Sequence, residues 1–209
     1  MELFSSLDAV SRRWNVLDHP FYTRWSRGEL TLDELGFYSG EYRHAVEALA
    51  EATAMVARAC EPAVRAEMEV HASQEAAHVE LWDGFMVALG AEQGRAPRAE
   101  TVECVESWTA GADALAGLTT LWAIESAQPA VARTKLEGLI EHYEVAPEGP
   151  ATAYFSLHAE LDHHHAAHSR RLIEERAGDG DVERLTGAAE RALRGNWTLL
   201  DGVEREFGR

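Results

Sequence analysis

The same spacing of histidine and acidic residues occurs twice in this chain, in segments that begin 87 residues apart at His71 and His158. Each copy has the form His-x3-acid-x2-His, and the copies are His71, Glu75 and His78, then His158, Asp162 and His165. On an α-helix this spacing places three side chains within about 60° of one another. Apolar residues flank both copies, and an unpaired buried acid costs several kcal/mol. We therefore expect two buried helix faces that share a cation.

Helix signals extend over most of the chain, and no segment shows convincing β alternation. Thr31-x-x-Glu34 is a capping box ahead of a periodic run to Cys60, and Pro62 and Gly90 mark the start and end of the next helix. We predict an all-α bundle of seven or eight helices in a single domain over 1–209. The predicted helices are 4–14, 31–60, 63–89, 99–110, 112–126, 129–143, 151–176 and 182–207, with a turn or short helix over 20–28.

Charge and composition exclude several classes of protein. With 19 basic and 36 acidic residues the net charge is −17, which disfavours a nucleic acid or an anionic membrane as partner. No run of 18 apolar residues exists, so we expect no membrane span. Two cysteines exclude a disulfide scaffold and a cysteine-only metal site, and no secretory signal is visible, so we expect a cytoplasmic protein. The single lysine, Lys135, is attributed to genome base composition.

Two further acids lie in apolar helical stretches. Glu125 follows Trp122 and Ile124, and Glu41 lies between aromatic residues. One acid from each of two helices, together with histidine–acid sets from two others, is the arrangement of carboxylate di-iron proteins. Two alternatives stay open, because Glu125 could pair with an arginine such as Arg133, and Glu41 could belong to a solvated face.

Residues 19–170 resemble the heme-oxygenase-like superfamily, which includes thiaminase II and pyrroloquinoline-quinone synthase. The stretch HPFYTRWSRGELTLDELGFYSGEYRHAVEAL, starting at His19, is similar to the opening of that group. HVELWDGFMVALG, from His78 to Gly90, is similar to the segment after its first histidine ligand. The second His-x3-acid-x2-His pattern, with Glu125 upstream, resembles the signature of the heme-oxygenase-like di-iron oxidases.

The resemblance implies two irons per chain, Fe(II)/Fe(III), with O2 as co-substrate. The matching ligands are His78, Glu125, His158, Asp162 and His165, with Glu41 as an extra carboxylate. Many members have glutamate where this chain has His71, which leaves open whether His71 or Glu75 binds metal. We expect Glu125 to bridge the irons, with His78 and either Glu41, Glu75 or His71 on one of them and the second pattern on the other.

The predicted function is a non-heme di-iron oxidase or oxygenase that acts on a small molecule in specialised biosynthesis. The family expectation is an amino-acid-like or fatty-acid-like substrate. Glu125, Tyr42 and His44 are the candidate catalytic residues, and Tyr38, Tyr154 and Trp122 are further candidates for the pocket lining. An external electron donor and a homodimer are also expected. Two rival functions are a cofactorless oxidase, in which the histidines act as acids and bases, and a non-catalytic metal-binding helical protein.

Overall fold

The computed structural model describes residues 2–111 and 113–208, and every regular element in these ranges is helical. The predicted all-α class is therefore confirmed. The α-helices are α1 (Glu2–Arg13), α2 (Pro20–Trp25), α3 (Leu32–Ala59), α4 (Pro62–Ala88), α5 (Ala99–Thr109), α6 (Ala114–Glu125), α7 (Gln128–His142), α8 (Ala153–Arg176) and α9 (Val182–Glu206). Ala112, the first residue of the predicted helix 112–126, lies outside the described ranges. Within those ranges, no helix is both long and apolar enough to cross a bilayer.

Local sequence determines where the long helices begin. The Thr31 hydroxyl accepts a hydrogen bond from the Glu34 backbone N–H at 3.2 Å, and the Glu34 carboxylate accepts one from the Thr31 N–H at 2.8 Å. This is the predicted capping box, and it starts α3. Pro62 lies in the first turn of α4, where its missing N–H costs no hydrogen bond. The Asp113 side chain accepts from the Ala116 N–H at 2.9 Å and starts α6.

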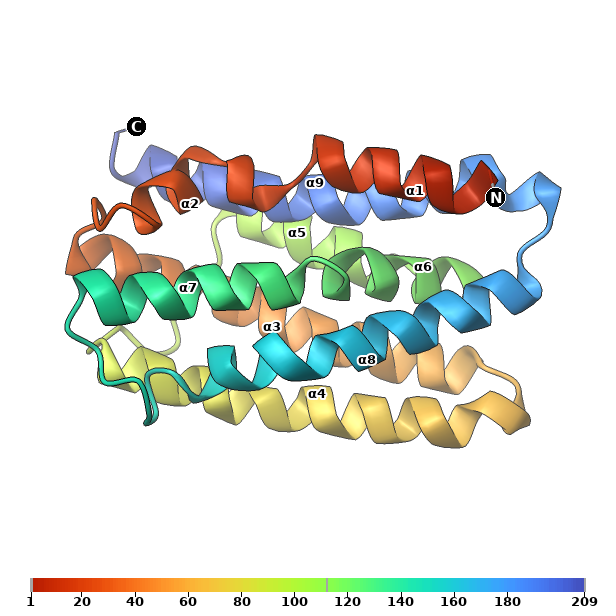
Figure 1. Ribbon diagram of the computed structural model, residues 1–209, viewed down its shortest axis with the longest axis horizontal. Coiled ribbons are helices and arrows are strands. Elements are labelled where there is room, and N and C mark those ends of the chain that lie inside the picture. Colours follow the sequence, from red (N-terminus) through yellow and green to blue (C-terminus); the bar gives the residue numbers. More distant parts are fainter. Residues whose placement is uncertain (1, 112, 209) are drawn as a thin grey trace.

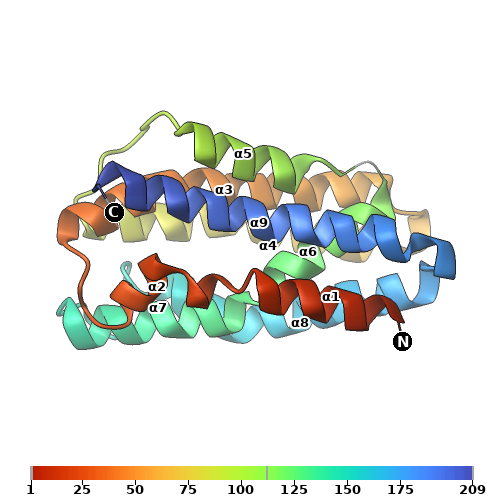
Figure 2. The same cartoon turned by 90° about the horizontal axis from the view of Figure 1, so that it is seen from above.

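The helices form a layered bundle around α6 (Figures 1 and 2). α3 and α4 are an antiparallel pair, α8 contacts α4, α6 and α7, and α9 covers α5 and α6. Ten of the twelve residues of α6, from Ala116 to Glu125, are buried. A helix buried on all sides must lie in the core, so Glu125 at its end is also inside the bundle.

α5 and α9 approach each other closely at a glycine. A Cβ atom added at Gly195 of α9 would lie 2.1 Å from Oγ of Ser107 and 3.2 Å from Cα of Cys104, both on α5. The absence of a side chain at Gly195 therefore sets the spacing of these two helices.

Candidate metal centre

Three helices bring together the side chains of both sequence patterns and Glu125. α4 supplies the first pattern, α8 the second and α6 supplies Glu125. All seven side chains are buried, and the most accessible of them, His165, is only 7% exposed. Their shared helix faces therefore point inward, as the spacing predicts.

One group combines residues of all three helices. His71, Glu75, Glu125 and His165 each offer one ligand atom, and these atoms lie within 4.8 Å of one another. Nε2 of His71 is 2.9 Å from Oε1 of Glu125 and 3.7 Å from Oε1 of Glu75. Nδ1 of His165 is 3.4 Å from the same Glu75 oxygen. The four residues could therefore hold a metal ion.

A second group lies next to the first and shares Glu75 with it. Glu75, His78 and His158 meet the same 4.8 Å criterion. Oε2 of Glu75 is 3.3 Å from Nδ1 of His78, and the rings of His78 and His158 are 4.5 Å apart. The two oxygens of Glu75 thus face different groups, which is the geometry required of a bridging carboxylate.

Several buried atoms of these groups and of the neighbouring Asp162 have no hydrogen-bond partner among the described residues. They are both ring nitrogens of His71, Oε1 of Glu75, both oxygens of Glu125, Nε2 of His158, Oδ2 of Asp162 and Nδ1 of His165. Native proteins pair roughly nine in ten buried polar groups, so a cluster of unpaired ones requires an explanation. Metal ions would satisfy these lone pairs together, so the residues fit the metal that the patterns predict.

Hydrogen bonds to the ring nitrogens that face away from the two groups fix the rings of His158 and His165. Nδ1–H of His158 donates to the backbone carbonyl of Tyr154 at 2.7 Å, which leaves Nε2 facing the second group. Nε2–H of His165 donates to the side-chain oxygen of Gln74 at 3.1 Å, which leaves Nδ1 facing the first group. Such partners set the orientation and tautomer of histidine ligands.

Buried carboxylates raise the pKa values of two histidines of the cluster, so the cluster favours positive charge. Burial lowers the pKa of His71, but the carboxylates of Glu125 and Glu75 outweigh burial and raise this pKa to about 10. Burial also lowers the pKa of His165, which Asp162 and Glu75 raise to about 9. In the absence of metal, these two imidazoles therefore carry protons at neutral pH.

In the neighbouring groups, burial is the largest influence on the pKa and determines the direction of the shift. Burial lowers the pKa of His158 to about 4, so this ring is neutral at neutral pH. Burial raises the pKa of Glu125, and His71 offsets part of this increase. Burial likewise raises the pKa of Asp162, and His165 offsets part of it. A neutral imidazole beside carboxylates is the protonation state that a metal ion requires.

The remaining predicted site residues lie at different distances from the two groups. Oδ1 of Asp162 is 3.6 Å from Nδ1 of His165, but Asp162 belongs to neither group. The structure also does not bring Glu41 into them, because its carboxylate accepts hydrogen bonds from the Arg98 N–H at 3.0 Å and from the Thr101 hydroxyl. Glu41 thus binds the start of α5.

His44 and Tyr42, the other predicted catalytic residues, have hydrogen-bond partners outside the two groups. His44 is partly exposed, and its Nε2 lies 3.0 Å from the carbonyl oxygen of Arg95. Tyr42 is buried, and its hydroxyl accepts a hydrogen bond from Gln128 at 3.1 Å. The pairing of Glu125 with Arg133 does not occur, since Arg133 is exposed and Glu125 faces His71.

An aromatic cage, which the sequence did not reveal, surrounds Lys135. Nζ of Lys135 lies between 4.4 and 5.6 Å from the centroids of five rings, those of Tyr42, Tyr38, Trp82, Phe155 and Tyr22. Burial lowers the pKa of Lys135 to about 7. The only available signal was a lone lysine among 19 basic residues, and genome composition does not account for its buried position.

The cage is continuous with the metal centre. The ring of Tyr154 stacks on His158 at 3.9 Å and packs edge-on against Trp82 at 4.8 Å. On the far side of the cage the hydroxyls of Tyr22 and Tyr38 lie 3.2 Å apart. The charge of Lys135 contributes to the lowered pKa of His158, which shows how near the cage lies to the cluster.

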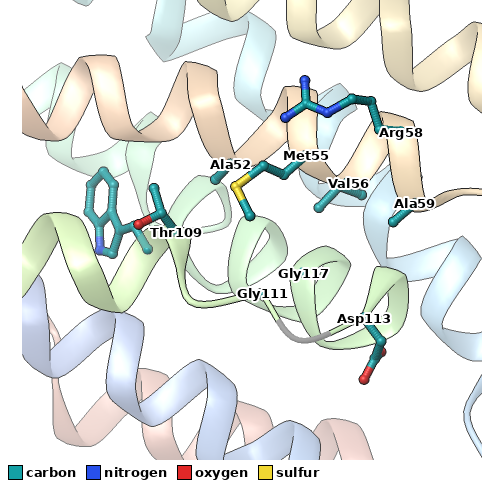
Figure 3. A pocket seen from close by; sticks show the side chains of 10 residues that line it. Ala52, Met55, Val56, Arg58, Ala59, Thr109, Gly111, Asp113 and Gly117 are labelled. Carbon is teal, nitrogen blue, oxygen red and sulfur yellow. The ribbon is translucent and has the colours of Figure 1, made fainter.

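A separate cavity of about 380 Å³ opens between α3, α5 and α6 (Figure 3). Its walls are mainly apolar, and the side chain of Met55 points into it. The described residues that line this cavity include none of the predicted site residues.

Comparison with known proteins identifies the family. Residues 35–197 match the sequence profile of a haem-oxygenase-like family of iron-containing redox enzymes. A 4-aminobenzoate synthase from Chlamydia muridarum is 29% identical over 214 residues, which cover 96% of this chain and 89% of the relative. A 4-aminobenzoate synthase from Nitrosomonas europaea is 28% identical and covers 96% of this chain and 90% of its own length.

Solved structures support the fold. A heme-oxygenase-like domain of unknown function from Shewanella denitrificans superposes with a TM-score of 0.83 at 18% identity, covering 99% of this chain and 94% of its own. A CADD-like protein of unknown function from Nostoc punctiforme gives a TM-score of 0.74 at 16% identity, with 96% and 97% covered. The predicted heme-oxygenase-like fold is thereby confirmed. Since the family profile matches most of the chain, this protein belongs to the haem-oxygenase-like family of iron-containing redox enzymes.

Proposed function

We propose that this chain binds two iron ions and catalyses an O2-dependent oxidation that forms 4-aminobenzoate or a closely related aromatic amino acid. The observation that carries the proposal is the pair of buried histidine–carboxylate groups that share Glu75. The product class follows from the 4-aminobenzoate synthases, which resemble this chain over 96% of its length. The family resemblance implies an amino-acid-like or fatty-acid-like substrate, and an aromatic amino acid as product is compatible with the first of these.

The two groups divide the ligands between two ions. His71, Glu125 and His165 would hold one ion, His78 and His158 the other, and Glu75 both. Asp162, 3.6 Å from Nδ1 of His165, adds a third buried carboxylate. Three carboxylates nearly balance two divalent cations, so the loaded site would be close to neutral and would tolerate burial.

The protein supplies orientation and a dry environment. When bound, iron would supply the electrons that reduce O2, and an external donor would restore them. The chain holds its imidazoles in fixed tautomers through the Tyr154 carbonyl and the Gln74 amide. Its aromatic cage excludes water on the side of His158, and burial in the cage lowers the pKa of Lys135 to about 7.

The rival functions fit the same observations less well. A cofactorless oxidase would keep the unpaired oxygens of Glu125 and Asp162 buried at a cost of several kcal/mol with no ion to satisfy them. A metal-storage protein does not require an aromatic cage or a buried lysine with a lowered pKa beside its ligands. We therefore favour the redox enzyme over both alternatives.

An anaerobic Fe(II) titration tests the proposal. The wild-type protein should bind two irons per chain, and after addition of O2 and a reductant it should consume O2 and form an aromatic amino acid detectable by mass spectrometry. Glu125→Gln should bind less iron and lose product, whereas His163→Gln, at an exposed neighbour on α8, should behave like wild type. Binding of a single iron, or of two irons without O2 consumption, would exclude this function.

A further inference from the structure

We propose that Gln74 is a positioning residue that determines which nitrogen of His165 faces the metal centre. The inference rests on the proposed function, because Gln74 acts on the metal only through His165. The side-chain oxygen of Gln74 can only accept, so Nε2 of His165, 3.1 Å away, carries the proton. Nδ1 is then the ring atom available for an ion, and it faces Oε1 of Glu75 at 3.4 Å.

The position of Gln74 on α4 makes this contact specific. Gln74 and Glu75 are consecutive, and consecutive helical side chains diverge by about 100°. A ring that both side chains contact must therefore lie in the angle between them. The ring of His165, which comes from α8, occupies this position, with Nε2 on Gln74 and Nδ1 on Glu75. Two consecutive residues of α4 thus contact the two ring nitrogens of His165.

His158, the other α8 histidine of the two groups, shows why a change at Gln74 should affect one group and not both. His158 donates to the carbonyl of Tyr154, four residues earlier in the same helix, so its orientation depends on backbone alone. His165 depends on a side chain that can be exchanged without altering α8. A change at Gln74 should therefore weaken the group of His71, Glu125 and His165 and spare the group of His78 and His158.

The size of the effect follows from what replaces the amide. Gln74 is exposed, so in its absence water can accept from Nε2 but cannot hold the ring. A half-rotation of the ring exchanges Nδ1 for the carbon Cδ2, which offers no lone pair to an ion. Loss of such a partner weakens metal binding about 10–100-fold, and the exposed position favours the lower end of this range.

Zn(II), which is redox-inert, is the probe for a titration of wild type and three variants. Gln74→Leu should weaken one of the two zinc sites about 10-fold, and Gln74→Glu, which keeps an acceptor oxygen, should restore most of the affinity. Gln93→Leu is the matched control, since Gln93 is also exposed and, within the described ranges, its amide donates one hydrogen bond, to the Ala91 carbonyl at 3.4 Å. Thermal unfolding should show that all variants are folded.

Proton NMR of the metal-free protein gives a second readout that needs no metal. The Nε2–H proton of His165 should exchange slowly in wild type, Gln74→Glu and Gln93→Leu, and rapidly in Gln74→Leu. Unchanged zinc affinity in Gln74→Leu would overturn the positioning role, and unchanged proton exchange would do the same. If wild type binds no Zn(II), the proposed function fails, and the exchange comparison by itself decides whether Gln74 fixes the ring.

Discussion

Nε2 of His71 lies 2.9 Å from Oε1 of Glu125, yet within the described part of the chain neither atom has a partner with hydrogen-bond geometry. The two residues come from different helices, α4 and α6. Their approach is favourable only if a positive charge lies between or beside them. In the metal-free protein a proton on His71 supplies this charge, and in the loaded protein a metal ion would replace it.

This exchange predicts that metal binding strengthens as the pH rises. The pKa values of His71 and His165 are raised to about 10 and about 9, so both rings are protonated at pH 7, and an ion must displace two protons. Zn(II) affinity should then increase by up to about 100-fold per pH unit below pH 9. Competition titrations at pH 6.5, 7.5 and 8.5, with proton release followed in weak buffer, provide the measurement. A pH-independent affinity would contradict it.

The same raised pKa values predict that the metal-free protein becomes less stable as the pH rises. Both rings have folded-state pKa values above the unfolded value, so they stabilise the metal-free protein fully below pH 6.5. This contribution is lost as the pH rises through 9 to 10. Urea unfolding of metal-free wild type and His71→Gln should therefore converge at high pH. Equal separation of the two proteins at pH 7 and pH 10 would exclude this origin of stability.

The shared position of Glu75 predicts a hierarchy of variants. Glu75→Gln should reduce iron binding at both positions, because this residue belongs to both groups, whereas Glu125→Gln should affect one. His71→Ala should cost less than Glu75→Ala, since a carboxylate compensates iron charge better than an imidazole. Iron content after anaerobic loading and desalting measures the order. If Glu75→Gln retains two irons and Glu125→Gln loses both, Glu125 is the bridge that the sequence suggested.

Lys135 predicts a pH-dependent gain of stability on substitution. Its pKa is lowered to about 7, while the unfolded chain keeps a pKa near 10.4, so the unfolded state binds more protons between these values. Lys135→Met, which preserves volume, should raise the free energy of unfolding by about 1–4 kcal/mol at pH 6.5. The gain should shrink toward zero near pH 10.5. Above that pH, Lys135 is deprotonated in the unfolded chain as well, so folding no longer requires it to release a proton. Urea unfolding of both proteins, with exposed Arg133→Met as control, measures the difference. A gain that grows with pH would be inconsistent with this account.

Two glycines of α9 provide a test of the helix packing. Gly195→Ala should destabilise the protein by about 1–3 kcal/mol, because the new Cβ would lie 2.1 Å from Oγ of Ser107 and 3.2 Å from backbone of Cys104. At Gly187 of the same helix a Cβ meets only the flexible end of Arg191 at 3.4 Å. Gly187→Ala should therefore stabilise the helix by about 0.5–1 kcal/mol. Equal effects of the two changes in thermal unfolding would contradict the close approach of α5 and α9.

The features that could be predicted from the sequence depend on interactions within one helix. The Thr31–Glu34 box is a contact within one helical turn, and α3 begins there as predicted. The two His-x3-acid-x2-His patterns describe helix faces, and both faces are buried. A spacing along one helix says nothing, however, about which atoms of the next helix it meets. For that reason the sequence could not divide the ligands into two groups or identify Glu75 as the residue they share.

The misses depend on contacts between distant segments. The cage takes rings from α2, α3, α4 and α8, and Lys135 lies on α7, so its formation depends on how five helices pack. Glu41 looks like a ligand within α3, but the packing of α5 provides hydrogen bonds from Arg98 and Thr101 to its carboxylate. Gln74 was inconspicuous because its role is visible only when α8 brings His165 beside it.

The burial of Lys135 has a practical consequence for handling this protein. Since it is the only lysine in the chain, no side-chain amine is available at the surface. Acylating dyes and lysine cross-linkers would leave the side chains of the native fold untouched. The rate at which such a reagent slowly modifies Lys135 would instead report how often the aromatic core opens, and mass spectrometry of the peptide that contains Lys135 would measure this rate separately from labelling of the α-amine.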